Sequence, residues 1–321
     1  MIRAEHITRY YGSRCAVSDV SFEIGAHEVT GFLGKNGAGK STMLKILSGV
    51  LQPSAGKLLI DDVDMLENPH QLRALVGYLP DRPPLYDDMS VVEMLAYAGA
   101  LNGMPKERVA QRVPEVLELV ALENVQNDLV GWLSHGYRQR VGIAQAIVHQ
   151  PKLVILDEPI SGLDPEQIVG MRSLISDLKE DHTVLISSHI LTEMSQTVDR
   201  LLVIHEGKLV AQGAEEELTG KNTQLVELLI RGEEETLRDV MDAWLDETQS
   251  IEVTVESSGL LRVVVQGATG EACEAWVPSL VHAGLGVRHL AARATGLEEI
   301  FLGLTHQADA PPTSRTLGGA S

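Results

Sequence analysis

Short hydrophobic runs of strand length recur along the first two thirds of the chain, and helical periodicity follows the first of them. The run 29–33 (VTGFL) predicts a buried strand, after which apolar side chains recur at helical spacing over 43–50. Three later runs, at 153–156, 184–186 and 201–204, have the length and aliphatic content of central strands. This alternation predicts an α/β core.

Two regions depart from this pattern. Between 88 and 146 the strand signal is absent, and amphipathic stretches at 91–100 and 108–120 predict a helical subdomain. From about residue 224, strand and helix patterns follow one another in the order β-α-β-β-α-β, which predicts a small α+β domain of the ferredoxin-like type. The predicted strands are 225–230, 251–255, 260–265 and 287–290, and the predicted helices are 233–244 and 270–283.

The chain is therefore divided into three parts, at 1–222, 223–305 and 306–321. The last part is made largely of Pro, Gly, Ser, Thr and Ala with almost no large apolar side chain, and we predict that it is a disordered tail. The second part is a folded appendage, for which two roles stay open: a dimer contact or a passive unit.

The charge balance disfavours nucleic acid as a partner. The 321 residues include 26 Lys and Arg against 45 Asp and Glu, a formal net charge of −19. This balance disfavours nucleic acid, because binding it requires Lys and Arg to neutralise phosphates.

No run approaches the roughly 18 consecutive apolar residues that span a bilayer, and the N-terminus has no apolar core typical of a signal peptide. We expect a cytoplasmic protein that binds no nucleic acid.

The strongest chemical signal is the segment 34–41, GKNGAGKS, a full match to GxxxxGK[ST] between a predicted strand and a predicted helix. Glycines let the backbone curl and turn its N–H groups toward phosphates, and the helix N-terminus favours negative charge. Lys40 is predicted to reach the β- and γ-phosphates of ATP, and the Ser41 hydroxyl to ligate Mg²⁺. A Gly-rich turn with no ligand is the alternative, which this context disfavours. The predicted nucleotide-binding residues of this loop are Gly34, Asn36, Gly37, Ala38, Gly39, Lys40, Ser41 and Thr42.

A second signal follows the run 153–156, which ends in Asp157, Glu158 and Pro159. A buried strand that delivers two carboxylates to its C-terminal end suits a metal and a base at the edge of a sheet. We predict that Asp157 holds Mg²⁺ and that Glu158 polarises the attacking water. Without the phosphate loop, a strand that simply ends in solvent would be the better interpretation.

The segment 133–140, LSHGYRQR, resembles the signature motif of ABC ATPases, usually written LSGGQxQR, and it precedes the two carboxylates as in that family. His135 and Tyr137 depart from the motif. The resemblance implies that Ser134 and Gly136 bind the γ-phosphate of a nucleotide held by a second copy of the chain. A serine at a helix N-terminus followed by a glycine is chemically suited to bind an anion.

Other elements of the family follow in order. The segment 161–164, SGLD, resembles the loop that meets the second copy, which places Asp164 near the nucleotide. His189 matches a histidine that contacts the γ-phosphate, and Tyr11 matches the aromatic residue that stacks on adenine. Asp81 stands where the family usually has a glutamine that links Mg²⁺ and the attacking water. The resemblance implies that Asp81 contacts the nucleotide and Mg²⁺, directly or through water, although the shorter, negative aspartate departs from the family pattern.

The resemblance implies a P-loop NTPase core of the ABC type, with antiparallel β and helical subdomains, plus the small α+β C-terminal domain. It further implies an ATP hydrolase with Mg²⁺ as cofactor, Lys40, Glu158 and His189 as catalytic residues, and a dimer that sandwiches two ATP molecules. Its expected partner is a separate transmembrane permease of an exporter, on the cytoplasmic face of the membrane. The alternative is a soluble ABC ATPase that acts on nucleic acid or ribosomes.

Overall fold

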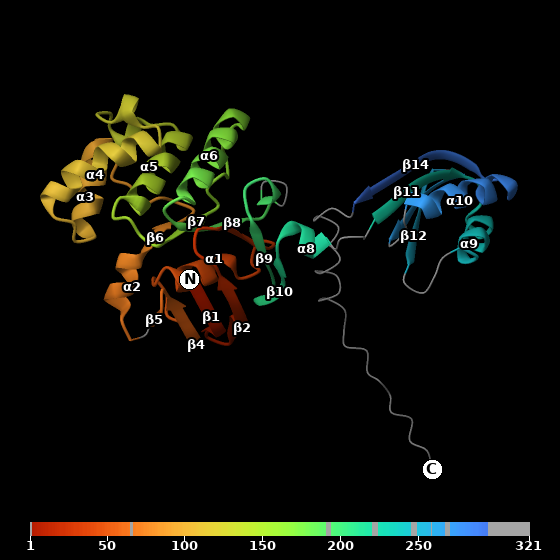
Figure 1. Ribbon diagram of the computed structural model, residues 1–321, viewed down its shortest axis with the longest axis horizontal. Coiled ribbons are helices and arrows are strands. Elements are labelled where there is room, and N and C mark those ends of the chain that lie inside the picture. Colours follow the sequence, from red (N-terminus) through yellow and green to blue (C-terminus); the bar gives the residue numbers. More distant parts are fainter. Residues whose placement is uncertain are drawn as a thin grey trace, which may run out of the picture. The chain divides into compact units, whose positions relative to one another are not determined.

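The computed structural model describes residues 2–64, 67–190, 194–219, 224–244, 249–257, 259–266 and 270–294. They form two compact units, which divide between Ala214 and Glu215 rather than after residue 222 (Figure 1). The predicted tail, 306–321, lies outside the described residues.

The first unit contains a six-stranded sheet in the order β10-β9-β3-β8-β7-β6. The strands from β9 to β6 pair in parallel, and only β10 is antiparallel to its neighbour. All residues of β3, β7 and β8 are buried, as expected for a parallel sheet covered on both faces. The strands are β3 (Val29–Leu33), β6 (Val76–Leu79), β7 (Leu153–Asp157), β8 (Thr183–Ser188), β9 (Arg200–His205) and β10 (Lys208–Gly213).

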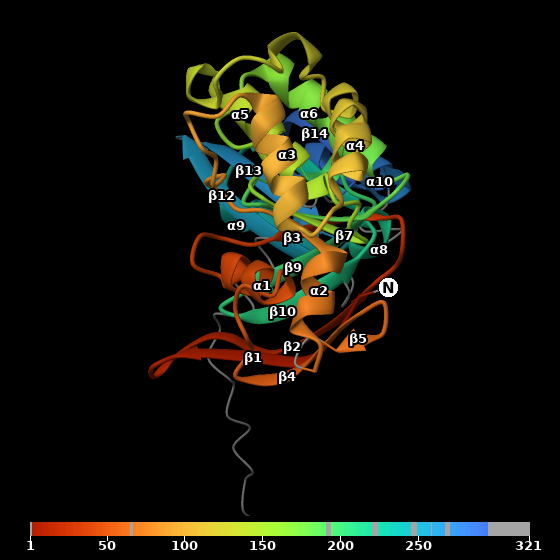
Figure 2. The same ribbon diagram turned by 90° about the vertical axis from the view of Figure 1, so that its left-hand side faces the viewer.

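The second sheet of this unit is antiparallel, in the order β2-β1-β4-β5. Helix α1 lies between the two sheets, and α2 lies at one end of them (Figure 2). Buried residues of both sheets and of α1, such as Phe22, Leu44 and Ile155, form one hydrophobic core. The elements are β1 (Ile2–Tyr11), β2 (Arg14–Ile24), α1 (Lys40–Leu47), β4 (Ala55–Ile60), β5 (Val63–Asp64) and α2 (Pro69–Leu75).

Helices α3, α4 and α5 fill the stretch in which the strand signal is absent, and α6 follows β7. Ser90 caps α3 by a reciprocal pair of contacts, because its hydroxyl accepts from the Glu93 N–H while the Glu93 carboxylate accepts from the Ser90 N–H. Short 3₁₀ turns at Glu123–Val125 and Val130–Trp132 lead into α5. The helices are α3 (Val91–Leu101), α4 (Lys106–Leu119), α5 (His135–Ile147) and α6 (Pro165–Leu178). No helix in the described part of the chain is both long and apolar enough to cross a membrane.

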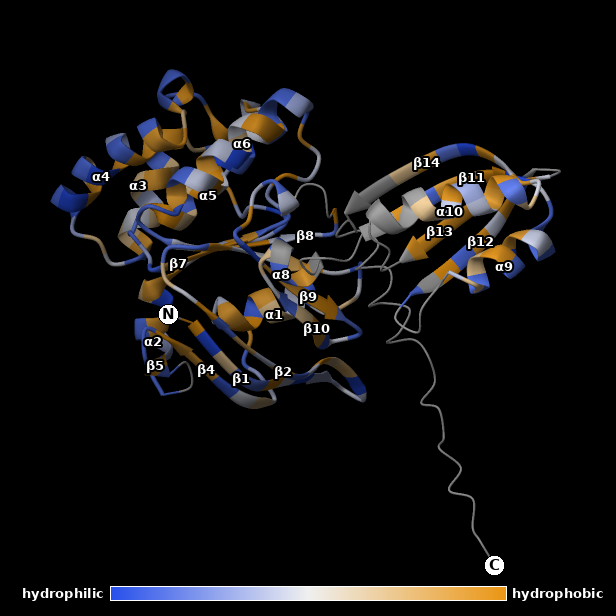
Figure 3. Ribbon diagram, turned by 45° about the vertical axis from the view of Figure 1, so that its right-hand side comes forward, coloured by the Kyte–Doolittle hydropathy of each residue, from blue (hydrophilic) through white to orange (hydrophobic). Residues whose placement is uncertain are grey.

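The second unit has the element order β-α-β-β-α-β after a short helix, and its four strands pair antiparallel in the order β12-β13-β11-β14. This is the arrangement of a ferredoxin-like split unit. Alternate residues of β11, such as Val226 and Leu228, pack with Trp276 and Leu280 of α10. In Figure 3, β13 is largely hydrophobic and part of β14 is polar. The elements are α8 (Glu215–Thr219), β11 (Gln224–Arg231), α9 (Glu234–Asp242), β12 (Ser250–Ser257), β13 (Leu260–Gln266), α10 (Gly270–His282) and β14 (Gly286–Ala294).

Parallel pairing has a direct consequence for the site. The carboxyl ends of β3, β6, β7 and β8 meet at one edge of the sheet, because all four strands run in the same direction. Asp157 is the last residue of β7, and the phosphate loop, Asp81 and His189 follow the other three strands, so segments distant in sequence converge there.

Candidate functional site

The loop between β3 and α1 depends on its glycines. Gly37 and Gly39 have φ values of +82° and +110°, which side-chain-bearing residues rarely adopt. A Cβ atom on Gly39 would also lie 2.6 Å from the Ala16 carbonyl oxygen, and one on Gly34 would lie 2.6 Å from the Ile204 carbonyl oxygen. Backbone therefore passes close to the loop on two sides, and only glycine fits at these positions.

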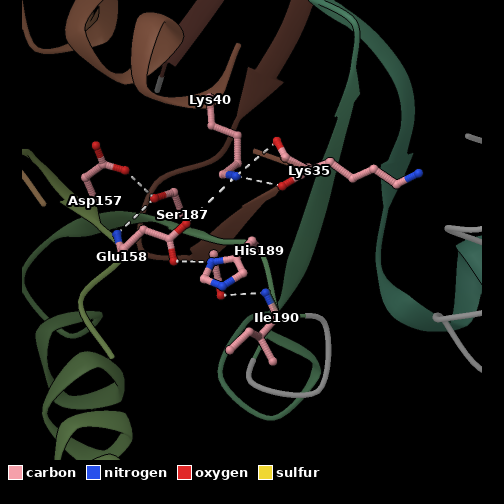
Figure 4. A network of polar contacts seen from close by, with 9 residues as sticks. Lys35, Lys40, Asp157, Glu158, Ser187, His189 and Ile190 are labelled. Atoms are coloured by element: carbon pink, nitrogen blue, oxygen red, sulfur yellow. Dashed lines mark hydrogen bonds and ion pairs between the residues drawn. The ribbon is translucent and has the colours of Figure 1, made fainter. Parts of the chain in front are cut away.

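Lys40 is 5% exposed and points back into this loop. Its Nζ donates to the Gly34 carbonyl oxygen at 2.6 Å and to that of Lys35 at 3.4 Å, and it lies 3.8 Å from Glu158 Oε1 (Figure 4). Burial lowers the pKa of the Lys40 ammonium, and the charges of Glu158 and Asp157 partly oppose this shift. The ammonium is thus held at the centre of the loop by backbone carbonyls rather than by a tight ion pair.

Ser187 of β8 joins Asp157, the last residue of β7, to the backbone of Glu158, the residue that follows β7. Its hydroxyl, which is fully buried, donates to Asp157 Oδ1 at 2.6 Å and accepts from the Glu158 N–H at 2.9 Å. Glu158 has φ +53°, in the left-handed region that non-glycine residues seldom occupy. Strained backbone of this kind persists only where neighbours hold it. Ser187 therefore orients both acids at the end of the strand.

His189, which follows β8, contacts the same glutamate. Its Nδ1 lies 2.9 Å from Glu158 Oε2 (Figure 4). Because a carboxylate oxygen only accepts, we assign the proton of this bond to Nδ1. The side chain of Glu158 is 16% exposed and that of His189 is 40% exposed. Glu158 thus has Lys40 near one oxygen and His189 on the other, at the mouth of the site.

These groups line one cavity of about 510 Å³, within the range of small-molecule sites. Tyr11 stands at its rim with 47% of its surface exposed, and the Arg9 guanidinium lies 5.2 Å from the centre of its ring. The structure brings together here eleven of the residues predicted from the sequence: Tyr11, Asn36, Gly37, Gly39, Lys40, Ser41, Thr42, Asp81, Asp157, Glu158 and His189.

Comparison with known proteins agrees with this geometry. A model of the ABC transporter family matches residues 17–161. YxlF of Bacillus subtilis, an uncharacterized ABC transporter ATP-binding protein, is 31% identical over 306 residues, which cover 95% of this chain and 100% of YxlF. The bacitracin transport ATP-binding protein BcrA of Bacillus licheniformis is 32% identical over 95% of this chain and 97% of its own length. The chain belongs to the ABC transporter ATP-binding proteins.

Further relatives extend the comparison. The Nod factor export ATP-binding protein I of Cupriavidus metallidurans is 31% identical over 95% of this chain and 97% of its own length. Similarity in sequence therefore continues well beyond residue 220, although the sequence motifs end before it. Among solved structures, cbiO1 from Clostridium perfringens, part of an ABC transporter complex, superimposes with a TM-score of 0.63 at 30% identity, over 68% of this chain and 89% of cbiO1. The dimeric bacterial ABC transporter cassette MJ0796 gives 0.61 at 25%, over 67% of this chain and 98% of MJ0796.

As an ABC ATPase, the protein binds and hydrolyses ATP, and the resemblance inferred from its motifs is confirmed. The P-loop α/β fold inferred with it is confirmed as well. Five predicted nucleotide-binding residues, however, do not line the cavity of their own chain: Gly34, Ala38, Ser134, Gly136 and Asp164. Gly34 and Ala38 are buried in the loop itself.

The other three lie at the N-termini of two helices of this ATPase. Ser134 is the N-cap of α5, and its hydroxyl accepts from the Tyr137 N–H at 3.5 Å. Asp164 is the N-cap of α6, and its Oδ1 accepts from the Gln167 N–H at 2.9 Å. A Cβ on Gly136 would lie 2.6 Å from Gln167 Oε1, so the α6 side chain packs directly on the glycine. Ser134 and Asp164 are exposed, and their side chains cap helices.

Four cavity residues were missed in the sequence: Arg14, Ala16, Lys35 and Ser161. Arg14 pairs with Tyr11 across the β1–β2 hairpin, and the tight Gly12-Ser13 turn between them was a usable signal for that pairing. Lys35 belongs to the loop motif itself. Ser161 is the first residue of the SGLD segment, whose resemblance implied a contact with the second copy and not a place in the cavity of its own chain.

Proposed function

We propose that this ATPase powers a separate membrane permease in an exporter. Its support is the nearly full-length similarity to ATP-binding proteins of bacitracin transport and of Nod factor export. The net charge of −19 argues against the alternative of an ABC ATPase acting on nucleic acid or ribosomes. In this proposal the protein lies on the cytoplasmic face of the membrane, held there by its permease.

The observation that carries the proposed chemistry is the contact of Glu158 with both Lys40 and His189. We assign Lys40 to the β- and γ-phosphates, since it is the buried cation at the centre of the loop. Glu158 accepts the proton of the water that attacks the γ-phosphorus, while the bond to the bridging oxygen breaks and ADP leaves. With Nδ1 of His189 donating to Glu158, its Nε2 is the nitrogen left to face the γ-phosphate.

Mg²⁺ fits the donor set of this cavity. Ser41, Asp157 and Asp81 offer hydroxyl and carboxylate oxygens, the ligands that Mg²⁺ prefers. Across the residues with described positions, no group of three or more His, Cys, Asp or Glu side chains could hold a metal. A bound Mg²⁺ would therefore take its remaining ligands from ATP and water, which is how this ion usually binds in ATPases. It would neutralise charge on the phosphates.

The N-termini of α5 and α6, at which Ser134 and Asp164 are exposed, support a site shared between two copies. Ser134, Gly136 and Asp164 lie outside the cavity of their own chain, although an N-terminus such as that of α5 favours an anion. We propose that they meet the nucleotide of a second copy, as in a sandwich of two chains and two ATP molecules. The similarity to a dimeric cassette supports this assembly. Tyr11 then stacks on adenine with its exposed ring face.

The permease contact is proposed on residues 81–93. Tyr86 in this stretch is 53% exposed and makes an edge contact with Tyr97 of α3, with ring centroids 5.6 Å apart.

Purifying the tagged chain from solubilised membranes is expected to recover an integral membrane protein. Recovery of ribosomes or nucleic acid in its place would favour the alternative function.

Glu158→Gln tests the chemistry. It removes the proton acceptor at constant size, so turnover should fall by about 10²–10⁴ while ATP affinity is retained. Glu166→Gln, on the exposed first turn of α6, is the matched control and should hydrolyse ATP at the wild-type rate. Wild-type turnover in Glu158→Gln would remove Glu158 from the role of base.

Mixed dimers test the shared site. Ser134→Arg and Lys40→Ala should each abolish hydrolysis in a pure preparation, one by blocking the N-terminus of α5 and the other by emptying the phosphate loop. A mixture of the two should regain activity, because a heterodimer has one intact composite site. The absence of rescue at every mixing ratio would count against a site shared between copies.

A further inference from the structure

His135 makes a contact that the usual motif residue, glycine, does not offer. Its Nε2 lies 3.1 Å from the carbonyl oxygen of Ser161, across 26 positions of sequence. A carbonyl oxygen only accepts, so Nε2 is the donor. The bond joins the first turn of α5 to the segment that follows β7.

Ser161 belongs to the cavity. It is one of the residues that line it, together with Glu158 and His189. The Ser161 N–H donates to the Glu158 carbonyl oxygen at 3.2 Å, which closes the turn between the two residues. Because Glu158 is in the left-handed region, its carboxylate direction depends on the contacts that fix this turn. His135 therefore holds the far side of the turn that aims Glu158.

The imidazole of His135 is also packed against the residue after Ser161. Gly162 has φ +74°, and a Cβ atom on it would lie 3.4 Å from His135 Nε2, so the imidazole rests against this glycine. Beside it, Gln167 packs on Gly136, and the Gln167 N–H donates to Asp164. The first turn of α5 thus contacts the segment after β7 through His135 and the first turn of α6 through Gly136 and Gln167. Of these two contacts, the one through His135 reaches a residue of the cavity.

We infer that His135 is a positioning residue that couples the N-terminus of α5 to Glu158 in the cavity of the same chain. The inference rests on the proposed function, in which the second copy's nucleotide binds that N-terminus. Binding there moves or stiffens the first turn of α5, and the His135–Ser161 bond passes this change to the turn that carries Glu158. The position of Glu158 in one nucleotide site thereby depends on whether the other site holds a nucleotide, which is an allosteric coupling between the two sites.

Two substitutions at His135 separate the bond from the bulk of the ring. Gln keeps a donor at about the position of Nε2, whereas Leu keeps similar volume without a donor. For His135→Leu we expect kcat to fall by about three- to tenfold, the effect of one lost hydrogen bond, with KM for ATP within about twofold. The Hill coefficient for ATP should exceed 1 in the wild type, because the two sites are coupled, and should fall toward 1 in His135→Leu. His135→Gln should restore both the rate and the cooperativity. His135 is exposed, so the fold of both variants should be unaffected, which a thermal melt checks.

The mixture of Ser134→Arg and Lys40→Ala, measured alongside, tells two failures apart. If no mixing ratio restores hydrolysis, the proposed shared site itself is wrong. If mixing restores hydrolysis while His135→Leu matches the wild type in rate and Hill coefficient, the coupling through His135 is wrong. Equal loss in His135→Leu and His135→Gln would refute the donor role, and a wild-type Hill coefficient of 1 would refute the coupling.

Discussion

Ser187 is the side chain whose removal tests most directly how the site is held. In Ser187→Ala, Asp157 Oδ1 loses a 2.6 Å hydrogen bond and the Glu158 N–H loses its 2.9 Å acceptor. A hydrogen bond to a charged group contributes about 1.5–3 kcal/mol, and an unsatisfied buried donor costs about 1–3 kcal/mol. The hydroxyl is fully buried, so water does not readily replace it. We expect the variant to lose about 2–4 kcal/mol of stability.

The same change should impair hydrolysis. Without Ser187, the left-handed backbone of Glu158 loses one of its supports, so the carboxylate is aimed less accurately. Misplacement of a catalytic group by about 1 Å can cost a factor of about 10² in rate, and we expect kcat to fall at least tenfold. The affinity for ATP should stay close to that of the wild type, because the phosphate loop is unchanged.

Native-state hydrogen exchange of the β7 and β8 amides measures the stability of this sheet without interference from the C-terminal unit. Ser48→Ala is the matched control. Ser48 is 7% exposed and its hydroxyl donates to the Lys45 carbonyl oxygen at the end of α1. Ser48→Ala should therefore cost about 1 kcal/mol or less and leave kcat unchanged. If Ser187→Ala exchanges and hydrolyses like Ser48→Ala, then Ser187 does not orient the two acids.

Three further outcomes are expected. Burial lowers the pKa of His149 and of His182 in the folded protein. Below the ordinary pKa of about 6.5 the unfolded chain therefore binds more protons than the folded chain, and the free energy of unfolding should decrease as the pH is lowered from 7 to 5. Replacing both histidines with Gln should flatten this slope in urea titrations at pH 7 and pH 5, and an unchanged slope would contradict the assignment. A Cβ on Gly77 would collide with the Ala146 carbonyl, so Gly77→Ala should cost about 3 kcal/mol. Gly25→Ala, which meets only a flexible glutamate, should cost less than about 1 kcal/mol, and equal costs would argue against close packing of β6 on α5. A chain ending at residue 214 should still bind fluorescent ATP analogues, and an insoluble product would show that the first unit needs the second.

The sequence alone determined the fold class and most of the cavity. Continuous aliphatic runs such as 153–156 have few alternatives to a central parallel strand, because both of their faces need covering. Once those strands are parallel, the phosphate loop and the two carboxylates must meet at one edge, which is why eleven predicted residues line a single cavity. The alternation of the C-terminal strands likewise determined the element order of the second unit.

Tertiary structure alone decided which contacts tune those residues. Nothing local in the sequence marks Ser187 as the link between Asp157 and Glu158, because a serine within a strand is common and its partner lies 30 positions away. The same holds for His135, whose bond to Ser161 depends on how α5 packs beside the segment after β7. Sequence patterns report burial and periodicity, which are properties of one element, whereas these contacts require two elements to be positioned within about 3 Å of each other.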